Sequence, residues 1–371
     1  MKILYIGHYR EGGGWANAAI NTMLALDSAG VDVVCRNVKL TDTNVELHPR
    51  IQELENKPIQ DIEYCIQNVL PHHVVGTQKF KKNIAYFFSE STPLRSNWIS
   101  DLNLADEVWV ANEDNLKTLQ ESGIEVPVRV VGVPFDSSVV EQNRNKLDLS
   151  AINHKYKFYY IGDVNDRKNL SSIIRCFHAE FESYEPVALV LKINKFGFNP
   201  DQLKNKFVEM SNDIKQRMRI SNNVADFATE FIIPSRLSEE QMLDLHHTCD
   251  CFISPTHGEA WSIPAFEAMC FGNTPICSNE GGPKDFINEL DSDTGMLIDG
   301  VYSVCNHSDP AFTDIFTGRE EWFTPSESKI KKAMRFYYET QNVIDRTSGL
   351  KQAQKFNYEN ISNKIKEYLS E

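Results

Sequence analysis

The feature that most constrains this chain is a repeated alternation of short apolar runs with helical segments. Residues 2–7 form an apolar run that ends in glycine, helical spacing follows over residues 15–30, and a second apolar run covers residues 31–34. This order is typical of a strand, a helix and a second strand parallel to the first. The opening therefore predicts an α/β fold with parallel sheets.

The alternation occurs in two sets, separated by the polar, aperiodic stretch 134–155. Such a stretch is typical of a linker and a candidate hinge. We expect strands near residues 62–66, 84–88, 108–111 and 128–131 in the first set, and 156–161, 187–193, 229–233, 251–254, 274–277 and 296–298 in the second. Helices are expected over residues 171–182, 238–247, 263–271, 326–339 and 352–370.

The length of 371 residues suits two lobes, each with a full core. We predict an N-terminal Rossmann-like lobe over residues 1–145 and a C-terminal Rossmann-like lobe over residues 155–345. Residues 346–371 are expected to form a helix that packs back across the lobes.

Composition excludes some classes of partner. The net charge of −14 disfavours nucleic acid, because neutralising phosphates needs a basic surface. No apolar run reaches transmembrane length and no leader pattern opens the chain, so we expect a cytoplasmic protein with at most peripheral membrane contact, the basic run 79–82 being its one candidate. The eight cysteines lack the paired spacing of zinc sites and are predicted to be buried free thiols.

The segment 250–287 carries the strongest functional signal. Its apolar strand is followed by a loop that holds Glu259, and then by a helix for which Ser262 is the expected N-cap. The backbone N–H groups of residues 260–263 would lie at the start of that helix, where diphosphate or sugar hydroxyls bind readily. Glu267, in the same helix, supplies a second carboxylate that accepts hydrogen bonds from hydroxyls.

The spacing of Glu259 and Glu267, E-x7-E, and the run Glu-Ala-Trp-Ser-Ile-Pro resemble retaining glycosyltransferases of family four, which have the GT-B fold of two lobes facing a central cleft. The likeness continues through Gly272, Pro275 and the pair Gly281-Gly282. It implies that Glu267 binds ribose hydroxyls and that Glu259 binds the transferred sugar. The backbone at Ala260, Trp261, Ser262 and Ile263 would hold the sugar and diphosphate, although glycine is commoner in the family at positions 260 and 262.

The loop 162–169 resembles the basic phosphate-binding loop of the same family. Lys168 occupies the lysine position, while Asp163 stands where many relatives have arginine, so Arg167 is expected to take that role. Cations there would stabilise a leaving diphosphate. The alternative is a pair of ordinary exposed cations at the start of a helix.

First-lobe candidates are weaker. Gly13 and Gly14 follow the first strand, where the resemblance implies approach to donor phosphate, although a flexible turn explains them nearly as well. His72, His73 and Glu90 are the acceptor-side candidates. For Glu90 a structural cap or salt bridge is the alternative.

The resemblance implies a retaining, metal-independent transferase that moves a hexose from a UDP-, GDP- or ADP-sugar to a hydroxyl acceptor. No nucleophile motif and no metal-ligand cluster accompanies the site, so no cofactor is expected. Two alternatives remain open, because a fold alone does not set a reaction. One is a sugar-nucleotide 2-epimerase or phosphorylase on the same fold, and the other is a non-catalytic carbohydrate- or nucleotide-sugar-binding protein. The oligomeric state is left open.

Overall fold

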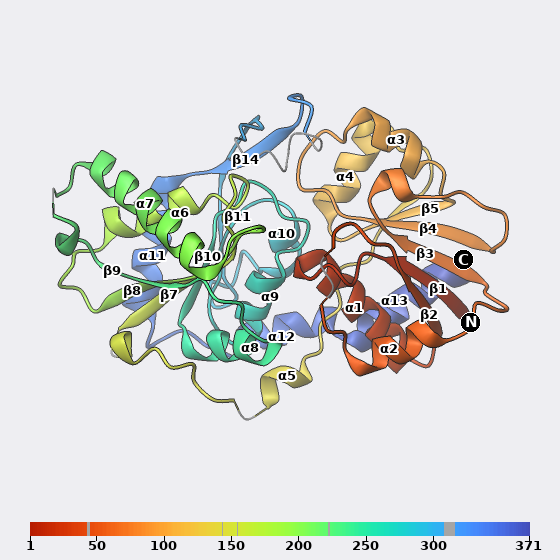
Figure 1. The fold of residues 1–371 in the computed structure, drawn as a ribbon, viewed down its shortest axis with the longest axis horizontal. Helices are drawn as coiled ribbons and strands as arrows, with labels where there is room; N and C mark the ends of the chain where they lie inside the picture. The colour runs from red at the N-terminus through yellow and green to blue at the C-terminus, as the bar shows by residue number, and fades with distance from the viewer. Residues whose placement is uncertain (43–44, 143, 154, 222, 308–315) are drawn as a thin grey trace. The chain divides into compact units, whose positions relative to one another are not determined.

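The structure is a computed structural model that describes residues 1–42, 45–142, 144–153, 155–221, 223–307 and 316–371 (Figure 1). Its residues group into two compact units. Unit 1 comprises Met1–Val139, Ala260–Ile263 and Ala353–Glu371, and unit 2 comprises Val140–Glu259 and Pro264–Gln352. The predicted linker 134–155 contains the short helix α5 (Ser138–Glu141) and a 3₁₀ turn, Ser150–Ile152, while its residues 143 and 154 lie outside the described residues.

Unit 1 contains a six-stranded parallel sheet with the order β2-β1-β3-β4-β5-β6. Its strands are β1 (Lys2–Gly7), β2 (Asp32–Asn37), β3 (Tyr64–Asn68), β4 (Lys82–Phe87), β5 (Glu107–Val110) and β6 (Val128–Val130). Its helices are α1 (Gly13–Ser28), α2 (Pro49–Asn56), α3 (Ser96–Leu102), α4 (Glu113–Ser122) and α13 (Tyr358–Ser370).

The last helix of the chain belongs to unit 1. Ile361, Ile365 and Leu369 of α13 are buried in the same apolar cluster as Ile3 of β1. In Figure 1, α13 lies beside α1, with which it is in contact. The C-terminal residues therefore complete the core built on the first strands.

Unit 2 contains a second six-stranded parallel sheet with the order β12-β11-β10-β7-β8-β9. Its strands are β7 (Tyr156–Asp163), β8 (Val187–Asn194), β9 (Thr229–Ile233), β10 (Cys251–Ser254), β11 (Ile276–Ser278) and β12 (Met296–Ile298). Its helices are α6 (Leu170–Glu180), α7 (Pro200–Met218), α8 (Glu239–Thr248), α9 (Ile263–Cys270, of which Ile263 groups with unit 1), α10 (Gly282–Phe286), α11 (Glu327–Thr340) and α12 (Ser348–Ala353, of which Ala353 groups with unit 1).

Buried apolar side chains explain why unit 2 folds this way. Phe158 of β7 and Leu189 of β8 share one cluster with Ile173 of α6, Phe207 of α7 and Met334 of α11. Strands with such continuous apolar runs are typical of parallel sheets that helices cover. The two predicted sheets are thus present, and every predicted strand overlaps an observed one.

The structure differs from the sequence-based expectation in several elements. Helix α7 and the antiparallel pair β13 (Gly300–Val304) and β14 (Glu321–Pro325) were not predicted. The expected helix 352–370 is divided, because the Asn357 side chain accepts a hydrogen bond from the backbone N–H of Asn360 at 2.8 Å and starts a new helix. All eight cysteines are buried and free, as predicted.

Candidate functional site

Glu259 lies in the loop between β10 and α9 and is buried, with 7% of its surface exposed. Its Oε1 lies 2.6 Å from Nζ of Lys168 and 3.4 Å from a guanidinium nitrogen of Arg167. The structure therefore brings together, within unit 2, the three side chains to which the sequence assigned the chemistry.

Hydrogen bonds connect the two loops that carry these side chains. The Arg167 guanidinium donates to the carbonyl of Gly258 at 2.6 Å, and the Arg167 carbonyl accepts from the N–H of His257 at 2.8 Å. Asn165 accepts from the N–H of Lys168 at 3.0 Å. Because β7 and β10 are parallel neighbours, their following loops meet at one edge of the sheet, where ligands bind in open α/β folds.

The charges around Glu259 favour the ionised form of its side chain over the protonated form. Burial raises its pKa, but the charges of Lys168 and Arg167, with hydrogen bonds from Lys168 and Thr256, outweigh burial and hold the pKa below its ordinary value of 4.5. Among the described residues, the Lys168 ammonium makes a side-chain hydrogen bond to Glu259 alone. An ammonium has three N–H donors, so two remain for an anionic ligand.

The Gly281-Gly282 pair packs against the loop that holds Glu259. The N–H of Gly282 donates to the carbonyl of Glu259 at 3.1 Å. Gly281 has a φ of 66°, and a Cβ there would lie 2.0 Å from that carbonyl oxygen. Only glycine lets the two backbones approach this closely, which gives the Gly281-Gly282 pair a structural reason.

The loop Ala260–Ile263 groups with unit 1. Within that unit, the Asn112 side chain donates to the Ala260 carbonyl, and the Trp261 ring lies 4.9 Å from that of Phe356. Ser262 has a φ of 66°, in the left-handed region, instead of the extended backbone that is usual for an N-cap. Ser262 directly precedes α9, as predicted, and its φ explains why glycine suits the position.

Glu267 lies in α9, with 22% of its side chain exposed, and one carboxylate oxygen is 3.3 Å from Nε2 of His246. It is thus open to solvent on one side and faces a buried histidine on the other. His246 was not predicted, because it lies in α8 with no local motif to single it out.

In unit 1, the Gly-rich segment lies at the start of α1. Gly13 has a φ of 80°, and a Cβ at Gly13 or Gly14 would meet no described atom within 4 Å. The backbone of both residues is therefore open to approach.

The acceptor-side candidates also lie in unit 1. His72 and His73 form a 3₁₀ turn after β3, with the His73 ring 5.6 Å from that of His8, which directly follows β1. Burial lowers the pKa of His73, and the nearby His72 lowers it further. Glu90 is half-buried in the loop after β4. His8 was missed, although its place directly after a strand is a usable signal.

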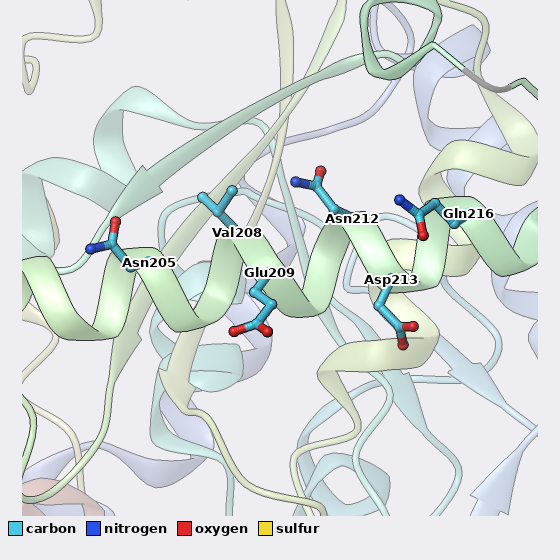
Figure 2. A pocket seen from close by; sticks show the side chains of 6 residues that line it. All are labelled: Asn205, Val208, Glu209, Asn212, Asp213 and Gln216. Carbon is cyan, nitrogen blue, oxygen red and sulfur yellow. The ribbon is translucent and has the colours of Figure 1, made fainter.

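Figure 2 shows a surface hollow lined by side chains of α7 alone: Asn205, Val208, Glu209, Asn212, Asp213 and Gln216. None of them was predicted as a site residue. Among the described residues, no cluster of His, Cys, Asp and Glu is arranged to hold a metal ion. No helix in the described part of the chain combines the length and apolar character needed to cross a membrane.

Residues 141–304 match the family model described as "Glycosyl transferases group 1". No curated protein matches the chain significantly.

Solved structures match over the whole chain. Sucrose-phosphate synthase from Thermosynechococcus elongatus is 12% identical, with a TM-score of 0.66 over 100% of this chain and 98% of that one. Anabaena HepE in complex with UDP is 15% identical, with a TM-score of 0.64 over 100% of both chains. HepE in complex with UDP-glucose is also 15% identical, with a TM-score of 0.64 over 100% of this chain and 99% of that one.

At these low identities the structural likeness concerns the fold, which is GT-B. The family model adds the enzyme class over residues 141–304. Together they confirm the prediction of a glycosyltransferase with a two-sheet GT-B fold.

Proposed function

We propose that this chain is a retaining, metal-independent glycosyltransferase that moves a hexose from a nucleoside diphosphate sugar to a hydroxyl acceptor. The observation that carries the proposal is the buried cluster of Glu259, Lys168 and Arg167 at the carboxyl edge of the second sheet. Unit 2 would supply the charged side chains that bind the donor, and unit 1 the acceptor-side residues.

The charges of this cluster suit the reaction. Breaking the bond between the anomeric carbon and the phosphate oxygen leaves negative charge on the diphosphate and positive character on the sugar ring. Lys168 and Arg167 would stabilise the diphosphate, and Glu259 would accept hydrogen bonds from the hexose hydroxyls. Two fixed cations supply the charge that a divalent metal supplies elsewhere, which supports metal independence.

The donor is proposed to be a UDP-, GDP- or ADP-sugar. HepE, a neighbour in fold, has been crystallised with UDP and with UDP-glucose, so UDP-sugars are the first to test. Glu267 would bind the ribose, and the backbone of residues 260–263, with Gly13 and Gly14, would bind the sugar and diphosphate. His72, His73 and Glu90 are the proposed acceptor-side residues.

We also propose a cytoplasmic location with at most peripheral membrane contact. The acidic charge of −14 and the buried free thiols support it, because reduced cysteines are typical of that compartment. The E-x7-E resemblance supports retention at the anomeric carbon, and NMR of the product's anomeric configuration tests it.

The first experiment incubates the protein with a panel of nucleotide sugars and acceptors and measures released nucleoside diphosphate. Release that depends on an acceptor supports transfer. Formation of a 2-epimer without acceptor would favour an epimerase, a phosphate-dependent release of sugar phosphate would favour a phosphorylase, and binding without turnover would favour a carbohydrate-binding protein.

Lys168→Ala tests the site assignment. We expect turnover to fall at least about tenfold, a barrier increase of about 1.4 kcal/mol, because a cation that stabilises the leaving diphosphate is lost. Folding should persist, since Arg167 still pairs with Glu259. Lys204→Ala, an exposed lysine of α7, is the matched control and should leave turnover unchanged. Equal rates for wild type and Lys168→Ala would contradict the assignment.

A further inference from the structure

A fully buried histidine lies behind the proposed ribose-binding carboxylate. His246 of α8 has 0% of its surface exposed, and its Nε2 is 3.3 Å from Oε2 of Glu267 in α9. Among the described residues, this Nε2 makes no aligned hydrogen bond. At 3.3 Å this nitrogen lies within reach of the carboxylate.

The neighbouring amide has a fixed orientation. The side-chain nitrogen of Asn273 donates to the His246 carbonyl and, at 3.0 Å, to the Tyr159 hydroxyl oxygen. The side-chain oxygen of Asn273 accepts from Arg346 at 3.4 Å. The reverse orientation of the amide would place oxygen against oxygen, so the nitrogen must face the histidine and the tyrosine.

This orientation determines where the proton of His246 lies. The Tyr159 hydroxyl accepts from Asn273, and among the described residues the only acceptor within reach of its single hydrogen is Nδ1 of His246, 2.6 Å away, to which it therefore donates. Nδ1 is therefore an acceptor. In a neutral imidazole the hydrogen must then be on Nε2, which faces Glu267.

The ring of His246 is held on its sides as well. It stacks on Phe271 at 5.8 Å with an interplanar angle of 14°, and the Tyr159 ring meets it edge-on at 5.5 Å. The donor at Nε2 therefore has little freedom, while Glu267 keeps one side open to a ligand. A preorganised donor of this kind fixes the orientation of the group it contacts.

We propose that His246 is a positioning residue, which directs the Glu267 carboxylate so that it accepts hydrogen bonds from both ribose hydroxyls of the donor. The inference rests on the proposed function, in which Glu267 binds the ribose. Its consequence is selectivity for ribonucleoside diphosphates over analogues that lack the two hydroxyls.

The test compares the affinity for UDP with that for 2′,3′-dideoxy-UDP by titration calorimetry. If GDP or ADP binds instead, the same pair is made with that base. The variants are His246→Phe, which keeps a ring but removes the donor, and Tyr159→Phe, which removes the hydroxyl that fixes the tautomer. We expect His246→Phe to reduce the preference for the ribonucleotide about tenfold, and Tyr159→Phe to reduce it less, with dideoxy affinity nearly unchanged.

Tyr337→Phe is the matched control, because it also removes one buried tyrosine hydroxyl, which donates to the Ser292 carbonyl at 2.8 Å. It should keep the full preference. Equal weakening of both nucleotides in the His246 and Tyr159 variants would overturn the inference, since that pattern means general destabilisation. If His246→Phe does not fold, Tyr159→Phe alone decides.

The variant Glu267→Gln distinguishes failure of the ribose-binding role of Glu267 from failure of the positioning role of His246. If it leaves the ribonucleotide preference intact, the ribose-binding role of Glu267 fails, and with it that part of the proposed function. If it removes the preference while both His246→Phe and Tyr159→Phe retain it, the role of Glu267 stands and the positioning role of His246 is refuted.

Discussion

At the scale of single residues, the central finding is that Glu259 is buried and that Lys168 and Arg167 balance its negative charge. Glu259→Gln keeps the shape but removes the charge, leaving Lys168 and Arg167 without their counterion. We expect the free energy of unfolding at pH 7 to fall by about 1–3 kcal/mol. Turnover should fall too, as for Lys168→Ala, because the cations are no longer held in place.

The effect should depend on pH. The folded-state pKa of Glu259 lies below its ordinary value of 4.5, so its contribution to stability is present above that value and is lost as the pH falls through the folded pKa. Urea unfolding of wild type and Glu259→Gln should therefore give a difference in unfolding free energy that narrows as the pH falls below 4.5. A gap of constant size across this range would show that the carboxylate charge does not stabilise the fold.

The sequence predicted some residues of the candidate site and missed others, for a physical reason. Glu259 and Lys168 follow strands and fit a local pattern, so the sequence was enough to assign both to one site, while the ion pair between them was not predicted. His246 and Tyr159 meet across 87 positions of sequence, and only the packing of α8 on the sheet brings them together. Ser262 shows a third case, in which a family preference for glycine was visible but the left-handed backbone behind it was not.

At the scale of elements, strands were predicted better than their connections. Most strands of the two sheets contain an apolar run, as is typical of parallel sheets that are covered on both faces. Helix α7 was missed although Leu203, Phe207 and Ile214 recur at helical spacing and are buried. Strand β13 has an exposed mixture of polar and apolar residues, with Val301 67% exposed, so no buried pattern marks it.

The N-terminal cap of α7, the helix that was not predicted, can be tested by mutation. Asn199 accepts from the N–H of Gln202 at 2.9 Å, and the Gln202 side chain accepts from the N–H of Asn199 at 3.1 Å, a reciprocal cap. Asn199→Ala should lower stability by about 1 kcal/mol. Thermal unfolding measures this, with Lys204→Ala as control inside the same helix. A midpoint equal to that of wild type would mean that the cap contributes nothing.

At the scale of the whole molecule, the chain's last helix stabilises its first sheet. Ile365 of α13 has 0% of its surface exposed and lies in the cluster that contains Ile3. Ile365→Ala should lower the free energy of unfolding of unit 1 by about 2–5 kcal/mol, because it leaves a cavity in that core.

Limited proteolysis and urea unfolding would detect this change. Peptides of unit 1 should become cleavable before those of unit 2. Asn363→Ala, on the exposed side of the same helix, should behave as wild type. Equal loss of protection in both units would contradict an effect confined to unit 1.

The placement of residues 353–371 in unit 1 also bears on how the protein is made. A ribosome releases the first sheet early, yet the helix that covers part of it is synthesised only after all of unit 2. The sheet of unit 1 therefore keeps apolar surface exposed to water and to chaperones until unit 2 and then residues 353–371 have been synthesised.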